Sequence, residues 1–151
     1  VVFGGGAEFH DFEIQSSACK NIIVNKLLPI ERVSEVYSLG DIALITCKKG
    51  VGKAGMPSKT WSIMACNTPI VASFDRESEL DLIVSAANAG ICIEPENPDK
   101  LKEAILECYE DKNRITSTGR DYVFKHASKN VCVGKYIEIL EREVKRKIKE
   151  N

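Results

Sequence analysis

Short runs of β-branched and apolar residues alternate with segments of helical periodicity along most of this chain. Strands that are joined by single helices need right-handed crossovers, and these produce a parallel sheet. The runs are almost continuously apolar, as expected where helices cover both faces of a sheet. The pattern therefore predicts an α/β fold, a Rossmann-like doubly wound parallel sheet. Strands are predicted at 1–3, 21–24, 41–46, 69–72 and 91–93, and helices at 8–19, 31–39, 57–66, 79–89, 98–111, 113–126 and 128–150.

Two residues mark helix ends in this pattern. Pro57 stands where a proline is favoured, at the first helical position, and Gly90 is placed to cap the helix at 79–89. In a doubly wound sheet, ligands bind where the carboxyl ends of the strands enter their loops. The loops to inspect therefore follow Phe3, Val24, Thr46, Ala72 and Ile93.

Composition excludes several classes of function. A net charge of -1 is unlike the basic excess of nucleic-acid-binding domains, and no apolar run is long enough to cross a bilayer. The six cysteines form no CxxC pair, which is typical of reduced thiols in a cytoplasmic protein. No signal peptide is visible, so we expect a cytoplasmic protein, at most peripheral at the inner face of a membrane. Because the chain opens on Val1 without an initiator Met, we expect a domain of a longer protein, with a processed N-terminus as the alternative.

The richest segment lies between the strand at 41–46 and the next helix. It carries Gly50, Gly52 and Gly55 just before Pro57. A glycine-rich loop that enters a helix offers backbone N–H groups and the positive end of the helix dipole, and phosphate binds well there. Ser58 and Lys59 would add a hydroxyl and a cation, whereas the alternative is a flexible loop with ordinary capping.

Two partial motifs do not hold. GVGK lacks the pattern of a phosphate-binding P-loop, because Cys47 stands where a Gly is needed and Ala54 where a Ser or Thr is needed. The glycines at 4–6 begin like a dinucleotide fingerprint, but Phe9 occupies its third glycine position. We interpret those glycines as a tight turn after the first strand.

An acidic run follows the strand at 69–72. Asp75, Glu77, Glu79 and Asp81 could bind a divalent metal through oxygen. Acidic residues also stabilise a first helical turn, and a solvated loop with a helix start is the favoured interpretation. No metal site is predicted.

Residues 55–73, GMPSKTWSIMACNTPIVAS, resemble the donor-site segment of glycosyltransferase family 4 (group 1). They are most similar to a subgroup with the pattern G-x-P-S-K-x-Y-E-x-M-A-x-G-x-P-V-I-A, which includes transferases of bacterial cell-surface polysaccharides. The similarity extends over nearly the whole chain. It includes FGGG at 3–6, the pair Tyr37 and Asp41, the pair Ser78 and Glu79, and GICIEPENPDKLKEAI at 90–105.

The resemblance implies a retaining glycosyltransferase with a GT-B fold, in which two Rossmann-like domains face a cleft. Residues 1–151 would be the C-terminal domain that binds a nucleoside diphosphate sugar. An N-terminal domain would supply the catalytic groups and bind a sugar or lipid-linked acceptor, so this chain alone would be inactive. The apolar residues of the helix at 128–151 are spaced three to four apart; a solvated amphipathic helix is the favoured interpretation, and packing on the N-terminal domain is the alternative. Neither a cofactor beyond the co-substrate donor nor nucleic acid is implied, and UDP bearing an amino- or deoxysugar is the favoured donor.

The resemblance also assigns site residues. The diphosphate would lie at Pro57, Ser58, Lys59 and Thr60, the ribose at Ser62, and the base at Asn25, Lys26 and Leu27 in the loop after Val24. The donor sugar would meet Gly52, Lys53, Gly55 and Met56, together with Glu79.

The sequence departs from the family at two acidic positions. These positions, eight apart, hold Ala54 and Ser62, and Asn67 replaces a usual Gly. A hydrogen bond to a charged group contributes about 1.5–3 kcal/mol, so the loss of both acids would weaken donor binding. Two alternatives therefore stay open, a GT-B nucleotide-sugar epimerase and a non-catalytic domain with a decayed donor site.

Overall fold

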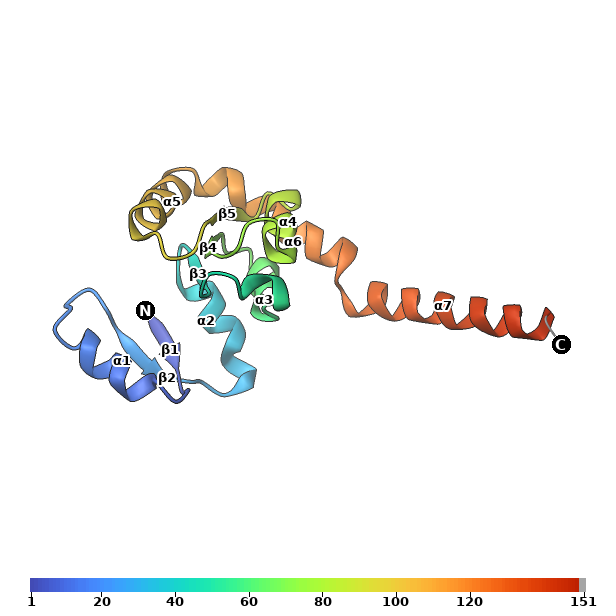
Figure 1. Cartoon of the computed structure of the whole chain (residues 1–151), viewed down its shortest axis with the longest axis horizontal. Coiled ribbons are helices and arrows are strands. Elements are labelled where there is room, and N and C mark those ends of the chain that lie inside the picture. The colour runs from blue at the N-terminus through green and yellow to red at the C-terminus, as the bar shows by residue number, and fades with distance from the viewer. Residues whose placement is uncertain (150–151) are drawn as a thin grey trace. The chain divides into compact units, whose positions relative to one another are not determined.

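The computed structural model describes residues 1–149, with the side chains of 112–117 and 149 outside the description. The chain forms two compact units, Val1–Gly40 and Asp41–Asn151. Helices and strands follow one another in nearly the predicted order (Figure 1).

The first unit holds a pair of parallel strands. β1 (Val2–Gly4) pairs with β2 (Val24–Lys26), with Val2 opposite Val24. Helix α1 (Phe9–Ser16) joins the two strands, and the 3-10 helix η1 (Ile30–Arg32) leads into α2 (Val33–Leu39).

Two predicted boundaries in this unit are wrong. Helix α1 stops at Ser16 and does not reach 19, because the hydroxyls of Ser16 and Ser17 bond back to carbonyls of the last turn. Turns then carry the chain through Ile22, whose N–H donates to the Cys19 carbonyl. The second strand therefore begins at Val24, the residue where the prediction ended it.

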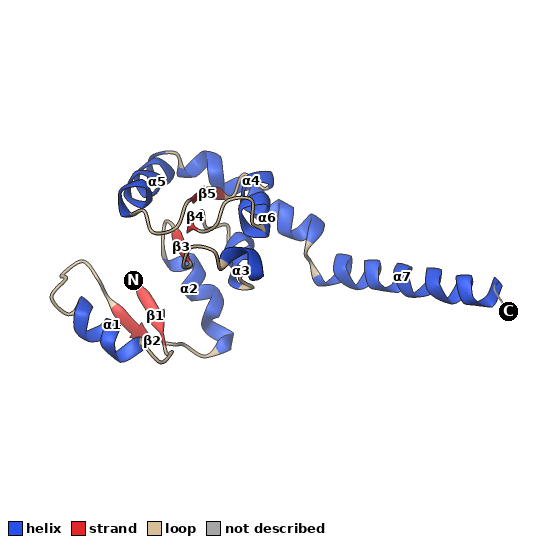
Figure 2. Cartoon of the chain, in the orientation of Figure 1, coloured by secondary structure: helices blue, strands red, loops and turns tan. Residues whose placement is uncertain are grey.

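The second unit is built on a three-stranded parallel sheet. Strands β3 (Ala43–Thr46), β4 (Ile70–Ser73) and β5 (Gly90–Ile93) lie in that order, with β4 in the centre and buried throughout (Figure 2). The predicted α/β class with parallel strands is confirmed, and the strands form two parallel sheets, one in each unit.

Helices surround this sheet and continue beyond it. They are α3 (Lys59–Ala65), α4 (Glu79–Ala86), α5 (Pro98–Glu110), α6 (Lys112–His126) and α7 (Lys129–Lys149), preceded by the 3-10 helix η2 (Gly52–Ala54). Val71 of β4 shares a buried cluster with Ala104 and Cys108 of α5, and Ile91 and Ile93 of β5 pack against it. Because alternate residues of a strand face opposite sides, this cluster defines the face that α5 covers.

The sequence predicted that Gly90 caps α4, and this prediction is wrong. Helix α4 ends at Ala86, and Asn88 takes the positive φ of 45° in the turn that follows. Gly90 is instead the first residue of β5, and a Cβ there would overlap the carbonyl of Ile70 in the neighbouring strand. A glycine is needed at this position because two backbones approach each other closely.

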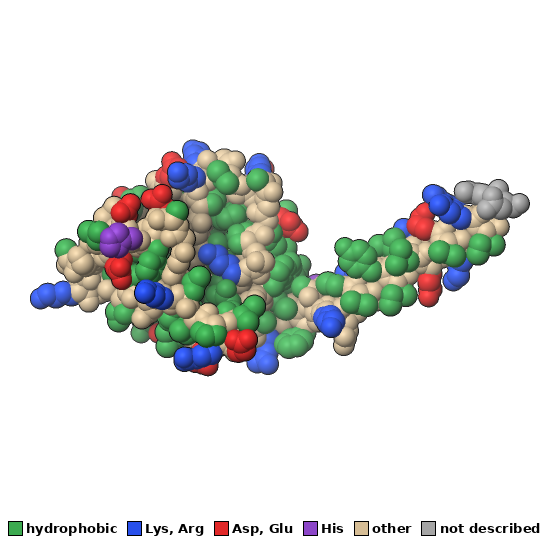
Figure 3. Space-filling model, turned by 90° about the horizontal axis from the view of Figure 1, so that it is seen from below, with side chains coloured by type: hydrophobic (Ala, Val, Ile, Leu, Met, Phe, Trp, Pro, Cys, Tyr) green, Lys and Arg blue, Asp and Glu red, His purple; other side chains and the backbone are tan. Residues whose placement is uncertain are grey.

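Helix α7 carries an exposed apolar stripe, visible along the helix in Figure 3. The stripe consists of Val133, Tyr136, Ile137, Leu140, Val144 and Ile148. Within the described part of the chain, no helix is both long and apolar enough to span a membrane.

Candidate functional site

Three loops leave the sheet of the second unit at one edge. Thr46, Ser73 and Ile93 lie side by side in the parallel register and end β3, β4 and β5. The loops that follow, at 47–58, 74–78 and 94–97, therefore start at the edge where ligands bind in folds of this kind. We call the first of them, residues 47–58, the glycine loop.

The glycine loop is fixed by a carboxylate from the loop after β4. The N–H of Gly50 donates to Oδ1 of Asp75 over 2.9 Å, and the N–H of Gly52 donates to Oδ2 over 2.7 Å. Gly50 has a φ of 84°, a conformation that glycine adopts without strain. These hydrogen bonds, first that from Gly50, hold the pKa of Asp75 below its ordinary value, helped by the charges of Lys53 and Lys49.

This contact changes what the glycine loop offers a ligand. The sequence predicted that its N–H groups would be open to phosphate, but those of Gly50 and Gly52 already bind an anionic group of the protein itself. Gly52 is also buried, and a Cβ there would lie 2.7 Å from the ring of Phe74. Gly52 therefore serves close packing against the loop after β4.

The loop after β5 joins the same network. The N–H of Lys49 donates to Oε1 of Glu96 over 3.3 Å, and the guanidinium of Arg76 donates to the carbonyl of Cys92 over 2.5 Å. Glu77 and Glu96 each have a φ of 61°, which is uncommon for residues other than glycine. All three loops at this edge are thus joined by hydrogen bonds from residues distant in sequence.

The acidic run is only partly the solvated segment that the sequence indicated. Asp81 is buried at 5% exposure; its Oδ2 lies 3.3 Å from Nε of Arg76 and accepts the N–H of Glu77. Its own N–H donates to Oγ of Ser78, the N-cap of α4. Asp81 therefore orders the start of α4. Among the described residues, no group of three or more His, Cys, Asp or Glu side chains is arranged to hold a metal ion.

The predicted diphosphate residues lie where the glycine loop joins α3, and they differ in exposure. The sequence predicted that Pro57 occupies the first helical position. Helix α3 begins at Lys59, so Pro57 precedes the helix and the prediction is wrong. Ser58 and Lys59 are exposed. Thr60 is fully buried, and its hydroxyl has no hydrogen-bond partner among the described residues. A ligand at this edge would meet Ser58 and Lys59 before it met Thr60.

The predicted sugar and ribose residues belong to the same unit. Lys53 and Gly55 are exposed, and Met56 is half-buried. Ser62 is exposed on α3, and Glu79 is exposed as the first residue of α4. Asn67 has a φ of 61°, so it fills a left-handed position after α3, consistent with a usual glycine there.

The predicted base-binding residues belong to the first unit. Asn25 and Lys26 lie within β2, and only Leu27 follows the strand. The prediction of one loop after Val24 is therefore wrong, because the strand starts three residues later than expected. The side chain of Leu27 lies against Gly5, where a Cβ would come within 3.0 Å of it.

Sequence reasoning missed the role of Asp75. The residue was considered only as a metal ligand or as part of a solvated loop. Its position offered a usable signal, because an acid two residues past a central strand lies next to the loop of the neighbouring parallel strand. A glycine-rich loop there supplies the N–H groups that a carboxylate accepts.

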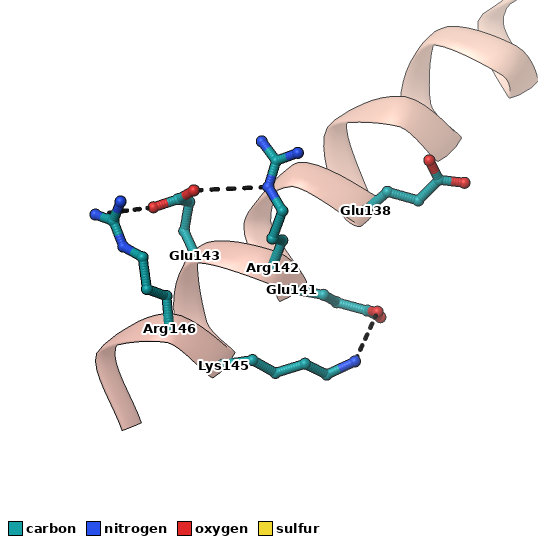
Figure 4. A pocket seen from close by; sticks show the side chains of 6 residues that line it. All are labelled: Glu138, Glu141, Arg142, Glu143, Lys145 and Arg146. Atoms are coloured by element: carbon teal, nitrogen blue, oxygen red, sulfur yellow. Dashed lines mark ion pairs between the residues drawn. The ribbon is translucent and has the colours of Figure 1, made fainter. Parts of the chain in front are cut away.

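A hollow beside α7 offers no comparable arrangement. It is lined only by charged side chains of that one helix, in which Glu143 lies 3.1 Å from Arg146 and Glu141 lies 3.9 Å from Lys145 (Figure 4). Exposed ion pairs of this kind contribute little to stability. We therefore place the candidate site at the sheet edge.

The fold agrees with comparisons to known proteins. Residues 1–111 match the family model of glycosyl transferases group 1, and the chain belongs to this family. It is similar to a probable glycosyltransferase, WbjE, of Pseudomonas aeruginosa, with 26% identity over 110 residues. That alignment covers 72% of this chain and 28% of the relative, so the chain spans less than a third of the relative's length. No solved structure matches it significantly.

Proposed function

We propose that this chain is the C-terminal, donor-binding part of a retaining glycosyltransferase of family 4 with a GT-B fold. In this proposal it binds a nucleoside diphosphate sugar at the edge formed by the loops after β3, β4 and β5. The observation that carries the proposal is the exposed pair Ser58 and Lys59, where the glycine loop anchored at that edge ends and α3 begins.

The chemistry of the proposed site concerns the leaving group. As the glycosidic bond to the diphosphate breaks, negative charge develops on the phosphate oxygens. The N–H of Thr60 already donates to the carbonyl of Pro57 over 3.0 Å. The start of α3 therefore offers the N–H of Lys59, which has no acceptor within the helix, and the positive charge of the Lys59 side chain. Donors that are fixed before the reaction stabilise such charge effectively. The catalytic groups and the acceptor site belong to an N-terminal domain in this proposal, and the chain alone is inactive.

The other donor contacts follow the family resemblance. Ser62 accepts a hydrogen bond from a ribose hydroxyl, and the base contacts Asn25, Lys26 and Leu27. Because the N–H of Gly52 is bound to Asp75, the backbone contacts to the sugar come from the later part of the loop. They are assigned to Lys53, Gly55 and Met56, with Glu79 at the start of α4.

The wider role also follows the resemblance. We propose a UDP-linked amino- or deoxysugar as the donor, and a sugar or lipid-linked acceptor in the synthesis of a cell-surface polysaccharide. The enzyme would act in the cytoplasm, at most peripherally at a membrane. The apolar stripe of α7 would pack on the N-terminal domain.

Ligand-observed NMR with UDP, GDP and ADP tests the proposal on this chain. We expect saturation transfer to one of these nucleotides. The transfer should be reduced in Lys59→Ala but not in Lys102→Ala. Lys102 is a matched control because it is an exposed lysine of α5. An equal signal in Lys59→Ala and the wild type would exclude the diphosphate from the start of α3.

One observation favours a second candidate, a domain of this family that no longer binds a donor. Ala54 and Ser62 stand where the family pattern has acids, and both are exposed. This candidate predicts no saturation transfer to any of the three nucleotides. The two candidates are thus separated by the wild-type measurement alone.

A further inference from the structure

Asp75 is the residue on which the shape of the glycine loop depends. Both of its carboxylate oxygens are used, one by the N–H of Gly50 and the other by the N–H of Gly52. Gly50 lies in a tight turn, in which the N–H of Val51 donates to the carbonyl of Lys48 over 3.3 Å, and Gly52 directly follows that turn. One backbone position within the turn and one after it are therefore tied to a single side chain.

The contact also starts the short helix that follows. Gly52 is the first residue of η2, and its N–H has no acceptor within that helix. The Asp75 carboxylate, which belongs to the loop after β4, supplies the acceptor and so caps the start of η2. The N–H of Ala54 then donates to the carbonyl of Val51, which completes the turn. The path of the chain from Gly52 to Ala54 is set in this way.

Packing reinforces the hydrogen bonds. Asp75 follows Phe74, which is buried at 3% exposure at the end of the central strand. The Phe74 ring lies beneath Gly52, where even a methyl group would overlap it. Asp75 thus follows a buried residue, and the glycine loop packs against that residue at Gly52.

We propose that Asp75 is a positioning residue for the sugar-nucleotide donor. It holds the glycine loop so that the segment from Lys53 to Met56 meets the donor, and it makes no contact with the donor itself. This inference rests on the proposed function and extends it, because the family resemblance assigned no role to Asp75. It also removes Gly50 and Gly52 from the set of phosphate-binding N–H groups.

A competing account makes the opposite prediction. If the N–H groups of Gly50 and Gly52 were the phosphate site, Asp75 would occupy that site and compete with the nucleotide. Replacing the carboxylate would then free the two N–H groups and strengthen nucleotide binding. Positioning requires the reverse, because a loosened loop no longer presents its later residues in the right geometry.

The test compares Asp75→Asn with Glu103→Gln in this chain. Both variants remove one negative charge, and Glu103 is exposed on α5, away from the three loops. The sugar nucleotide with the base that saturates best in the wild type (UDP-N-acetylglucosamine, GDP-mannose or ADP-glucose) is titrated into each variant, with ¹H–¹⁵N spectra recorded throughout. We expect Asp75→Asn to bind that nucleotide about tenfold more weakly, with the Gly50 and Gly52 amide signals moved upfield before any ligand is added. Glu103→Gln should match the wild type, and Asp75→Glu should restore part of the affinity.

Each outcome decides one point. Equal or tighter binding by Asp75→Asn, with the wild type binding normally, overturns the positioning role and leaves the proposed function standing. If the wild-type chain binds none of UDP, GDP and ADP, the proposed function is overturned, and so is this inference, which rests on it. Weaker binding together with unchanged Gly50 and Gly52 signals also overturns the inference, since the loss would then not pass through the loop.

Discussion

The carboxylate of Asp75 accepts a hydrogen bond of 2.7 Å from the backbone N–H of Gly52, a residue 23 positions earlier in the chain. The contact joins the loops after two neighbouring strands of a parallel sheet. Its geometry requires that residue 52 has no side chain, because the Phe74 ring fills the space where a Cβ would lie.

Replacing Gly52 by alanine tests this packing. The added methyl would lie 2.7 Å from Cε1 of Phe74 and 3.1 Å from Cβ of Asp75, so the loop must move away from its base. We expect a loss of about 1–3 kcal/mol in the free energy of unfolding, as for other overpacked positions. Urea denaturation followed by circular dichroism measures it. Gly55→Ala is the control, since no atom lies within 4 Å of its Cβ position, and a similar loss in both variants would refute the packing argument.

The contact should also respond to acid in a defined direction. The pKa of Asp75 in the folded chain is held below its ordinary value of 3.8, first by the Gly50 hydrogen bond. The ionised contact therefore stabilises the loop above that value and is lost as the pH falls through the lower folded-state pKa. The amide shifts of Gly50 and Gly52 should stay constant from neutral pH to about pH 4 and titrate only below it. A midpoint at or above 3.8, or the same titration in Asp75→Asn, would contradict the assignment.

Gly90 and Gly134 should respond in opposite ways to the same change. Gly90→Ala would force a Cβ onto the carbonyl of Ile70 and separate β5 from β4, at a cost of about 3 kcal/mol or more. Gly134 lies within α7 with no atom within 4 Å of its Cβ position, so alanine there should favour the helix by about 1 kcal/mol. Thermal unfolding monitored at 222 nm compares the two variants. A stable Gly90→Ala chain with an intact β4–β5 pairing would show that the close approach is not required.

The cysteines should differ in reactivity according to burial. Burial, and next the charge of Asp81, raise the pKa of Cys92 to about 12, and burial raises the pKa of Cys108 as well. The thiolate is the reacting species, so both should resist iodoacetamide at pH 8 in the folded chain. Cys19 and Cys132 are exposed and should be modified quickly. Peptide mass mapping measures the extent of modification at each cysteine. Modification of Cys92 at the same rate as Cys19 would contradict the buried environment of Cys92.

Local sequence patterns determined the class of fold and the order of its elements. Apolar runs of the right length predict strands, and the helical periodicity between them requires parallel connections, so these features depend on neighbouring residues alone. The order of residues in 55–73 also indicated the group 1 glycosyltransferases, the family whose model matches residues 1–111. Element ends were less well determined: Ser16 and Ser17 end α1 early through their own hydroxyls, and the turn that follows displaces β2 to Val24.

Only the tertiary structure decided how the candidate site is built. Gly90 looked like a helix cap until the neighbouring strand showed which backbone it must approach, and Thr60 looked accessible until packing buried it. Asp75 looked like one acid in a solvated run, because its partners lie 23 and 25 positions away. A hydrogen bond between distant loops depends on the register of β3 beside β4. That register is set by the packing of the whole sheet. The place of Asp75 after a central strand indicates which loop lies beside it, but only the register decides which N–H groups its carboxylate accepts.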